Sequence, residues 1–145
     1  MARAGFVARF VALVLDGIVL NVIAFAIAAV WAVFAGGASV TDSSVLDILQ
    51  AGVAIGAFLA ILSLQFIYFG VCWSRNGQTV GMRVMDIKAT RRGGQPMSFL
   101  RAALRGTIGY YISGAVFFMG FLWAAFDSRQ ETWHDKIFDT RVGRS

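Results

Sequence analysis

Residues 6–35 read FVARFVALVLDGIVLNVIAFAIAAVWAVFA, and this stretch decides what kind of protein the chain is. From Gly17 to Ala35 its only strongly polar side chain is Asn21. A helix needs about 20 apolar residues to cross the hydrocarbon core of a bilayer, and this run is long enough. It is also much longer than the apolar part of a cleaved signal peptide, roughly 7–15 residues. We therefore expect a retained transmembrane helix over residues 6–35.

Two further apolar runs follow, residues 48–73 and 106–126, and neither carries a charged side chain. The period-two alternation of a membrane barrel is absent, and backbone in lipid must satisfy its own hydrogen bonds. These features predict an all-α integral membrane protein with one domain, residues 1–145. A second transmembrane helix is expected over 48–73. A third helix over 106–126 either spans the membrane or enters it and returns.

Composition agrees with this class and excludes others. The chain has 145 residues, of which 58% are hydrophobic and 14% charged, whereas a soluble domain carries about 25% charge. One cysteine, Cys72, and one histidine, His134, exclude a disulfide scaffold and the multi-cysteine or poly-histidine metal sites. No nucleophile or phosphate-loop motif is present. We therefore expect no enzyme, no metal and no cofactor.

Lysine and arginine give the orientation. The basic loop, residues 74–105, carries seven of them and one acid, whereas residues 36–47 carry none. By the positive-inside rule, the N-terminus and the basic loop face the cytoplasm. Their positive charge suits contact with anionic lipid headgroups and accounts for the net charge of +5 without nucleic-acid binding. The polar tail, residues 127–145, lies on the same side of the membrane only if the third helix returns.

Short elements are expected inside the basic loop. Residues 80–84 alternate between apolar side chains and Gly or Arg, which favours a short cytoplasmic strand continuing to Ile87. Residues 91–94 then read as a turn. Ser98 is placed to cap a helix that begins near Phe99.

That helix carries Arg101 and Arg105 four residues apart, on one face. Two roles are open for them. They lie at headgroup level, with their charges reaching lipid phosphates, or they reach an acid on another segment.

Four acids in the tail stand at a strict spacing of four: Asp127, Glu131, Asp135 and Asp139. On one helix they would repel each other, so the stripe predicts a cationic partner. That partner is a bound cation, with His134 beside it, or the basic loop. A single Glu-x-x-His pair falls far short of a di-metal site, which favours the basic loop.

Arg9 and Asp16 are the charges inside the first run. They are seven residues apart, so they share one face, about 10 Å apart along the axis. Asp16 is ten residues into the run and is expected near mid-bilayer, where a charge costs about 2.5–3.5 kcal/mol. It is therefore either protonated or paired, and Asn21 and Gln65 could complete one buried polar patch. Such a patch either fixes helix packing or serves proton-coupled transport.

Four ordered motifs make the chain similar to the RDD family, bacterial and archaeal membrane proteins named for one arginine and two aspartates. The matching residues are Arg9 and Asp16; Gly77, Gln78, Thr79 and Gly81; Arg101 and Arg105; and Gln130, His134, Asp135 and Thr140. By this resemblance, Asp135 corresponds to the second of the two aspartates in the family's name. It implies a multi-pass protein of the bacterial inner (plasma) membrane, and a role in transport, with cation/proton antiport ascribed to some members.

The residues themselves favour a small non-catalytic membrane protein that acts as an accessory or assembly subunit of a larger complex. The alternative is an oligomeric ion or small-solute transporter that uses Asp16. Partners are other membrane subunits or further copies of the chain. Gly52 and Gly56 form a small-residue pair in the second run, which would let a neighbouring helix approach closely.

Overall fold

The computed structural model describes residues 4–35, 43–115, 122–123, 126–127 and 131–145. The predictions for residues 36–42 of the first loop, for residues 116–121 and 124–125 of the third segment, and for Gln130 lie outside the described residues.

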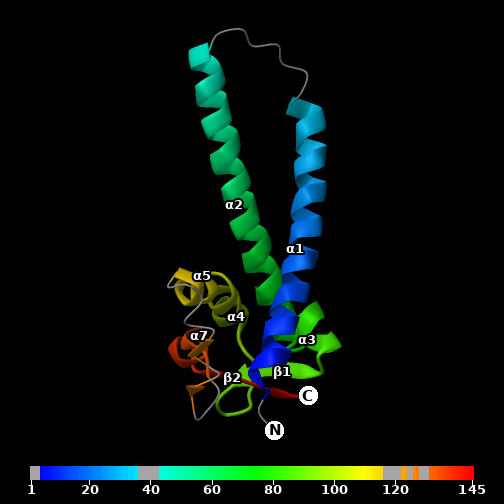
Figure 1. The fold of residues 1–145 in the computed structure, drawn as a ribbon, viewed down its shortest axis with the longest axis vertical. Helices are drawn as coiled ribbons and strands as arrows, with labels where there is room; N and C mark the ends of the chain where they lie inside the picture. The colour runs from blue at the N-terminus through cyan, green and yellow to red at the C-terminus, as the bar shows by residue number, and fades with distance from the viewer. Residues whose placement is uncertain (1–3, 36–42, 116–121, 124–125, 128–130) are drawn as a thin grey trace.

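Two long helices dominate the fold. Helix α1 comprises Phe6–Ala35 and helix α2 comprises Ser43–Arg75. They meet at one end and diverge toward the other (Figure 1). The first helix is confirmed as predicted, and the second is longer than the predicted 48–73. By length and composition both could cross a membrane, over Phe6–Val30 and Ser44–Arg75, and most of their apolar side chains are exposed.

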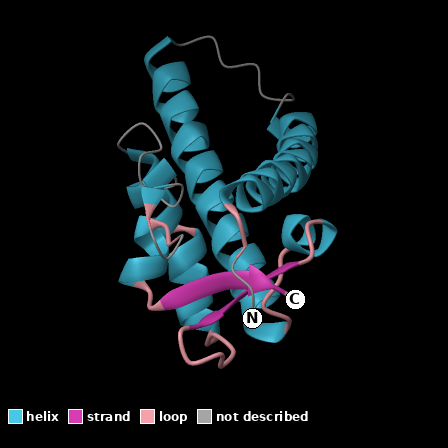
Figure 2. Ribbon diagram, turned by 60° about the horizontal axis from the view of Figure 1, so that its bottom comes forward, coloured by secondary structure: helices cyan, strands magenta, loops and turns pink. Residues whose placement is uncertain are grey.

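A small domain surrounds the end where the long helices meet, and we call it the basal domain (Figures 1 and 2). Its elements are α3 (Val80–Val84), β1 (Ile87–Arg91), α4 (Phe99–Gly106), α5 (Ile108–Ala115), α7 (Trp133–Ile137) and β2 (Thr140–Arg144). The strands pair antiparallel, with Ala89 opposite Val142. The predicted all-α class therefore needs a correction: a mostly helical chain carries one small two-stranded sheet.

The predicted strand over residues 80–84 is wrong, because this segment is helix α3. Thr79 occupies the N-cap, and its hydroxyl accepts a hydrogen bond from Met82 N at 3.2 Å, which favours helix. The strand begins only at Ile87, where the tail supplies a partner. Just before α3 the chain turns at Gly77, whose φ of +69° favours glycine.

Helix α4 begins at Phe99 after Ser98, as predicted. Helix α4 ends at Gly106, and α5 starts at Ile108, close to the predicted start of the third helix at residue 106. Gly106 lies directly on Phe69, whose side-chain atoms would stand 2.3 Å from a Cβ at this position. This close approach lets α4 pack along α2.

Both ends of the third segment contact the same short helix, α7. The ring centroids of Tyr110 and His134 are 4.9 Å apart, and those of Trp123 and Trp133 are 6.3 Å apart. A straight helix would separate residues 110 and 123 by about 20 Å, far more than the length of five-residue α7. Tyr110 and Trp123 both lie beside α7. Whether the third segment spans a membrane or returns stays a prediction.

An aromatic core joins α2 to the basal domain. Trp73 is fully buried and stacks on Phe69 at 4.8 Å, and Tyr110 meets both rings edge-on. The indole N–H of Trp73 donates to the sulfur of Met82 at 3.2 Å, so α3 is fixed to the same core. The guanidinium group of Arg105 lies over the Trp73 ring, with its central carbon 4.3 Å from the ring centroid.

Candidate functional site

Asp135 is the centre of a buried ionic cluster. Its side chain is fully buried and accepts from two arginines, Arg9 Nη1 at 2.6 Å and Arg105 Nη2 at 2.5 Å. Arg9 comes from the start of α1 and Arg105 from the end of α4. With Thr132 and Thr140, these residues form what we call the Asp135 cluster. The cluster ties together three segments that are far apart in the sequence.

Two threonines complete the hydrogen bonding of Asp135. Thr132 is the N-cap of α7, and its side chain and that of Asp135 bond each other's backbone N–H reciprocally, which is a capping box. Thr140, at the start of β2, accepts from Arg105 Nε at 3.0 Å and donates to Asp135 at 3.2 Å. The carboxylate is therefore held by side chains from α1, α4 and β2 and by the backbone N–H of the α7 N-cap.

The remaining nitrogens of Arg9 bond the backbone. Nε donates to Ala4 O at 3.2 Å and Nη2 to Val142 O at 3.0 Å, so the guanidinium also fixes β2 beneath α1. Burial alone would raise the pKa of Asp135. The charge of Arg105, assisted by His134 and Arg9, nevertheless holds the pKa of this carboxyl well below its usual range. The carboxyl is therefore ionised at neutral pH.

His134 lies beside the cluster and is uncharged. Its Nε2 is 2.9 Å from Thr132 Oγ1, and its ring meets Tyr110 edge-on. Burial and, to a lesser extent, the nearby charge of Arg105 lower the pKa of His134 from 6.5 to about 3. The buried neutral imidazole therefore acts as a hydrogen-bonding and packing group, and the described residues hold no cluster of His, Cys, Asp and Glu that could bind a metal.

This shift predicts loss of stability in mild acid. Below pH 6.5 the unfolded chain binds a proton on His134 that the folded chain does not, so the free energy of unfolding falls as pH falls. We expect a loss of about 2 kcal/mol between pH 6 and pH 4.5. Thermal unfolding in detergent across this range measures it. His134→Gln should flatten the profile, and an unchanged slope in that variant would contradict the assignment.

Asp16 is the centre of a second buried cluster. It is 2% exposed, and both its oxygens accept hydrogen bonds: Oδ2 from Thr79 Oγ1 at 2.5 Å, and Oδ1 from Tyr68 OH at 2.7 Å and Gly81 N at 2.8 Å. We call Asp16, Tyr68, Thr79 and Gly81 the Asp16 cluster. It connects α1 to α2 and to the start of α3. The carboxylate thus finds neutral donors where an arginine was expected.

Gly81 makes this cluster possible through its missing side chain. A Cβ at this position would lie 2.1 Å from the carbonyl oxygen of Ala12. The backbones of α1 and α3 therefore touch, which brings Gly81 N within reach of Asp16. Gly81 lies inside α3, where its missing side chain serves close helix packing.

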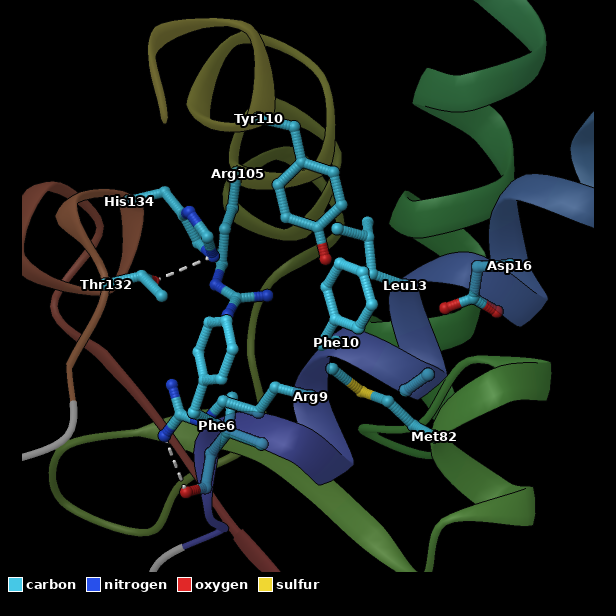
Figure 3. A pocket seen from close by; sticks show the side chains of 12 residues that line it. Phe6, Arg9, Phe10, Leu13, Asp16, Met82, Arg105, Tyr110, Thr132 and His134 are labelled. Carbon is cyan, nitrogen blue, oxygen red and sulfur yellow. Dashed lines mark hydrogen bonds between the residues drawn. The ribbon is translucent and has the colours of Figure 1, made fainter. Parts of the chain in front are cut away.

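The two clusters face each other across a small cavity. Arg9 and Arg105 lie on one side and Asp16 on the other, with Phe10, Leu13 and Tyr110 between them (Figure 3). The expectation that Arg9 and Asp16 belong to one patch is thus right in location. The ion pair of Arg9, however, is with Asp135, and Asp16 is bound by other groups.

Two members of the predicted polar patch do not belong to it. Asn21 is exposed and donates to Gly17 O of its own helix at 2.8 Å. Gln65 is half-buried in α2 and is not among the residues that line the cavity. Asn21 satisfies its side chain on its own backbone, so it needs no partner segment.

The four tail acids do not share one helix, since Trp133–Ile137 is helical whereas Asp127, Glu131 and Asp139 lie outside it. Their cationic partner is mainly the basic loop, as favoured. Arg92 pairs with Glu131 at 2.8 Å and Asp139 at 3.3 Å, and Arg105 pairs with Asp135. Asp127 pairs instead with Lys136 at 2.8 Å.

The two arginines of α4 separate in role. Arg105 reaches an acid on another segment, which was one of the two open alternatives. Arg101 is half-buried, and its Nη1 has no hydrogen-bond partner among the described residues. In the Gly-Gln-Thr motif, Gln78 Nε2 donates to Ile87 O at 3.0 Å, so this residue secures the turn between α3 and β1.

Three residues of the site were not anticipated: Tyr68, Trp73 and Thr132. Tyr68 and Trp73 stand near the end of the apolar run 48–73, a position that is typical of aromatic residues at a membrane interface and gives no sign of a site. Thr132 had a local signal, since a threonine three residues before Asp135 matches a capping box.

Comparisons with known proteins point to one family. A family model described as the RDD family matches residues 3–139, which include every described residue of both clusters except Thr140. The chain is 28% identical over 146 residues to "Uncharacterized protein YxaI" of Bacillus subtilis (strain 168), covering 96% of this chain and 95% of that protein. No solved structure matches the chain significantly.

Proposed function

The chain belongs to the RDD family, and from this premise we propose that it is a non-catalytic membrane protein that works as an accessory or assembly subunit of a larger membrane complex. The observation that carries the proposal is an apolar groove between α1 and α2. The groove measures about 690 Å³, and the helices that form it diverge away from the basal domain (Figure 1).

Small residues line this groove on both sides at a spacing of four. Its walls include Ala24, Ala28 and Ala32 from α1 and Gly52, Gly56 and Ala60 from α2. In a bilayer such residues let helix backbones approach closely, and association then comes from packing. A transmembrane helix of a partner subunit fits a groove of this chemistry, and the described residues supply no helix of this chain to occupy it.

The exposed parts of the long helices match a membrane in length. Residues 17–35 of α1 would extend about 28 Å and residues 44–64 of α2 about 31 Å, against a hydrocarbon core of about 30 Å. This placement moves Asp16 from mid-bilayer to the inner boundary. The positive-inside rule then assigns the basal domain and N-terminus to the cytoplasmic face of the bacterial inner membrane, with its basic side chains on anionic headgroups.

Ion transport, the alternative, finds less support in the polar groups. Asp16 engages both carboxylate oxygens with donors of the same chain, and Asp135 is held by two arginines. A carrier group has to exchange its ligand or proton during transport. These carboxylates are instead bound as packing groups, which suits a rigid subunit.

Two neighbouring alanines give a matched test of the groove. Ala28 lines it and Ala29 does not, although both are exposed on α1. We expect Ala28→Leu to reduce co-purification of larger membrane proteins at least tenfold in mild detergent, because the added side chain fills the space for a partner helix. Ala29→Leu should leave it unchanged. Quantitative mass spectrometry of the tagged native protein measures both.

Two results would count against this function. If the protein purifies alone or as a homo-oligomer, transport becomes the stronger candidate, and proton flux in liposomes comes next. If partners co-purify equally with both variants, a subunit role survives but the groove is not its binding surface.

A further inference from the structure

We propose that the cavity between the two clusters is a water-binding site, in which about one to three ordered water molecules link Arg105 to Asp16 and join the clusters into a single network. The inference goes beyond the proposed function and does not depend on it. It rests on an unpartnered arginine nitrogen, on the size of the cavity and on the charges that surround it.

The first observation is Arg105 Nη1. The side chain is 1% exposed, Nε is bonded to Thr140 and Nη2 to Asp135, but Nη1 has no hydrogen-bond partner among the described residues. Arg105 lines the cavity, and Figure 3 shows its guanidinium extending from α4 toward Phe10 and the Tyr110 ring. A buried guanidinium N–H without an acceptor costs free energy. An acceptor in the cavity would complete the hydrogen bonding of Arg105 Nη1.

The cavity has the right size for water. It measures about 40 Å³, and a water molecule needs about 10–15 Å³ by the same measure. Buried water also needs two or more polar partners, and the cavity offers the Arg105 donor on one side and the Asp16 carboxylate on the other.

The charges favour a neutral occupant. Arg9 and Arg105 oppose a cation, and Asp16 opposes an anion. Water accepts from a guanidinium and donates to a carboxylate at once, which neither kind of ion does. The remaining lining, which includes Phe6, Leu13 and Met82, is apolar and would confine the water to the line between the two charged groups.

The first experiment detects the water. In the full-length protein in nanodiscs, with nitrogen-15 arginine, we expect cross-relaxation between long-lived water and the guanidinium protons of Arg105. Xenon should not enter, because xenon binds dry apolar cavities. Xenon uptake with no water signal at Arg105 would overturn the proposal.

A variant that fills part of the cavity gives the second test, because the direction of the change in melting temperature distinguishes a wet cavity from a dry one. Val142 lines the cavity, whereas Val84 is 68% exposed on α3. In a wet cavity the added methyl of Val142→Ile displaces water that nothing replaces, so the melting temperature and the water signal should both fall. Val84→Ile should change neither. A rise in melting temperature for Val142→Ile indicates a dry cavity and contradicts the proposal.

A salt series separates water from an ion. At constant ionic strength, exchange of chloride for a larger anion should leave the melting temperature of the unmodified protein unchanged. A specific chloride dependence that disappears in Arg105→Lys would mean that the cavity holds an anion, and the proposal would be wrong. If Val142→Ile fails to fold, the water signal, xenon and salt measurements on the unmodified protein still decide the question.

Discussion

Asp135→Asn should abolish most of the stability of the basal domain. The amide removes the negative charge between Arg9 and Arg105, while both guanidinium groups stay buried in the same place. Removing one partner of a buried ion pair typically costs about 3–5 kcal/mol, which is a large share of the stability of a domain of this size. We expect the purified variant to unfold at least 15 °C lower in detergent, or to yield no folded protein.

The control is Asp139→Asn. Asp139 also pairs with an arginine, Arg92, but its side chain is 56% exposed, so this ion pair should contribute less than about 1 kcal/mol. Its φ of +53° is also well tolerated by asparagine. If the two variants lose similar stability, the Asp135 cluster is not what holds the basal domain together.

Gly81→Ala should produce the second large effect, through a single methyl group. The new Cβ would lie 2.1 Å from Ala12 O, and since the obstacle is helix backbone, α1 and α3 must move apart. That movement also breaks the hydrogen bond from Gly81 N to Asp16. Overpacking of this kind costs about 3 kcal/mol, measurable as a lower unfolding temperature.

Gly17→Ala provides the comparison, because no atom lies within 4 Å of a Cβ at that position in α1. It should be neutral or stabilising by up to about 1 kcal/mol, since alanine favours helix. Equal destabilisation by both variants would mean that helix packing at Gly81 is looser than the contact with Ala12 implies.

Much of the fold was predictable because its signals are local. Apolar length predicted α1 and α2, and the Ser98 cap predicted the start of α4. Strand β1 was displaced by a few residues in the prediction, because its position depends on pairing with Thr140–Arg144, which lies about fifty residues later. Periodicity over five residues could not separate a strand from the single turn of α3.

The charged residues of the site could be predicted from the sequence, but not which of them form ion pairs with each other. Arg9, Asp16, Arg105 and Asp135 were all selected from the sequence as chemically costly or motif-bearing residues. Spacing within α1 suggested Arg9 with Asp16, since they share a helix face. The actual partners, Arg9 and Asp135, are separated by 126 residues, and no local sequence pattern specifies a pairing over that separation.

The separation of Arg9 from Asp135 has a consequence for biosynthesis. Arg9 emerges early from the ribosome, with the first helix, and its counter-charge is made 126 residues later. Until then the guanidinium has only backbone and solvent as partners. A polypeptide interrupted before Asp135 would therefore carry two uncompensated arginines, on α1 and α4. Such an incomplete product would differ from the finished one in local charge, which gives quality-control proteases a physical basis for distinguishing the two.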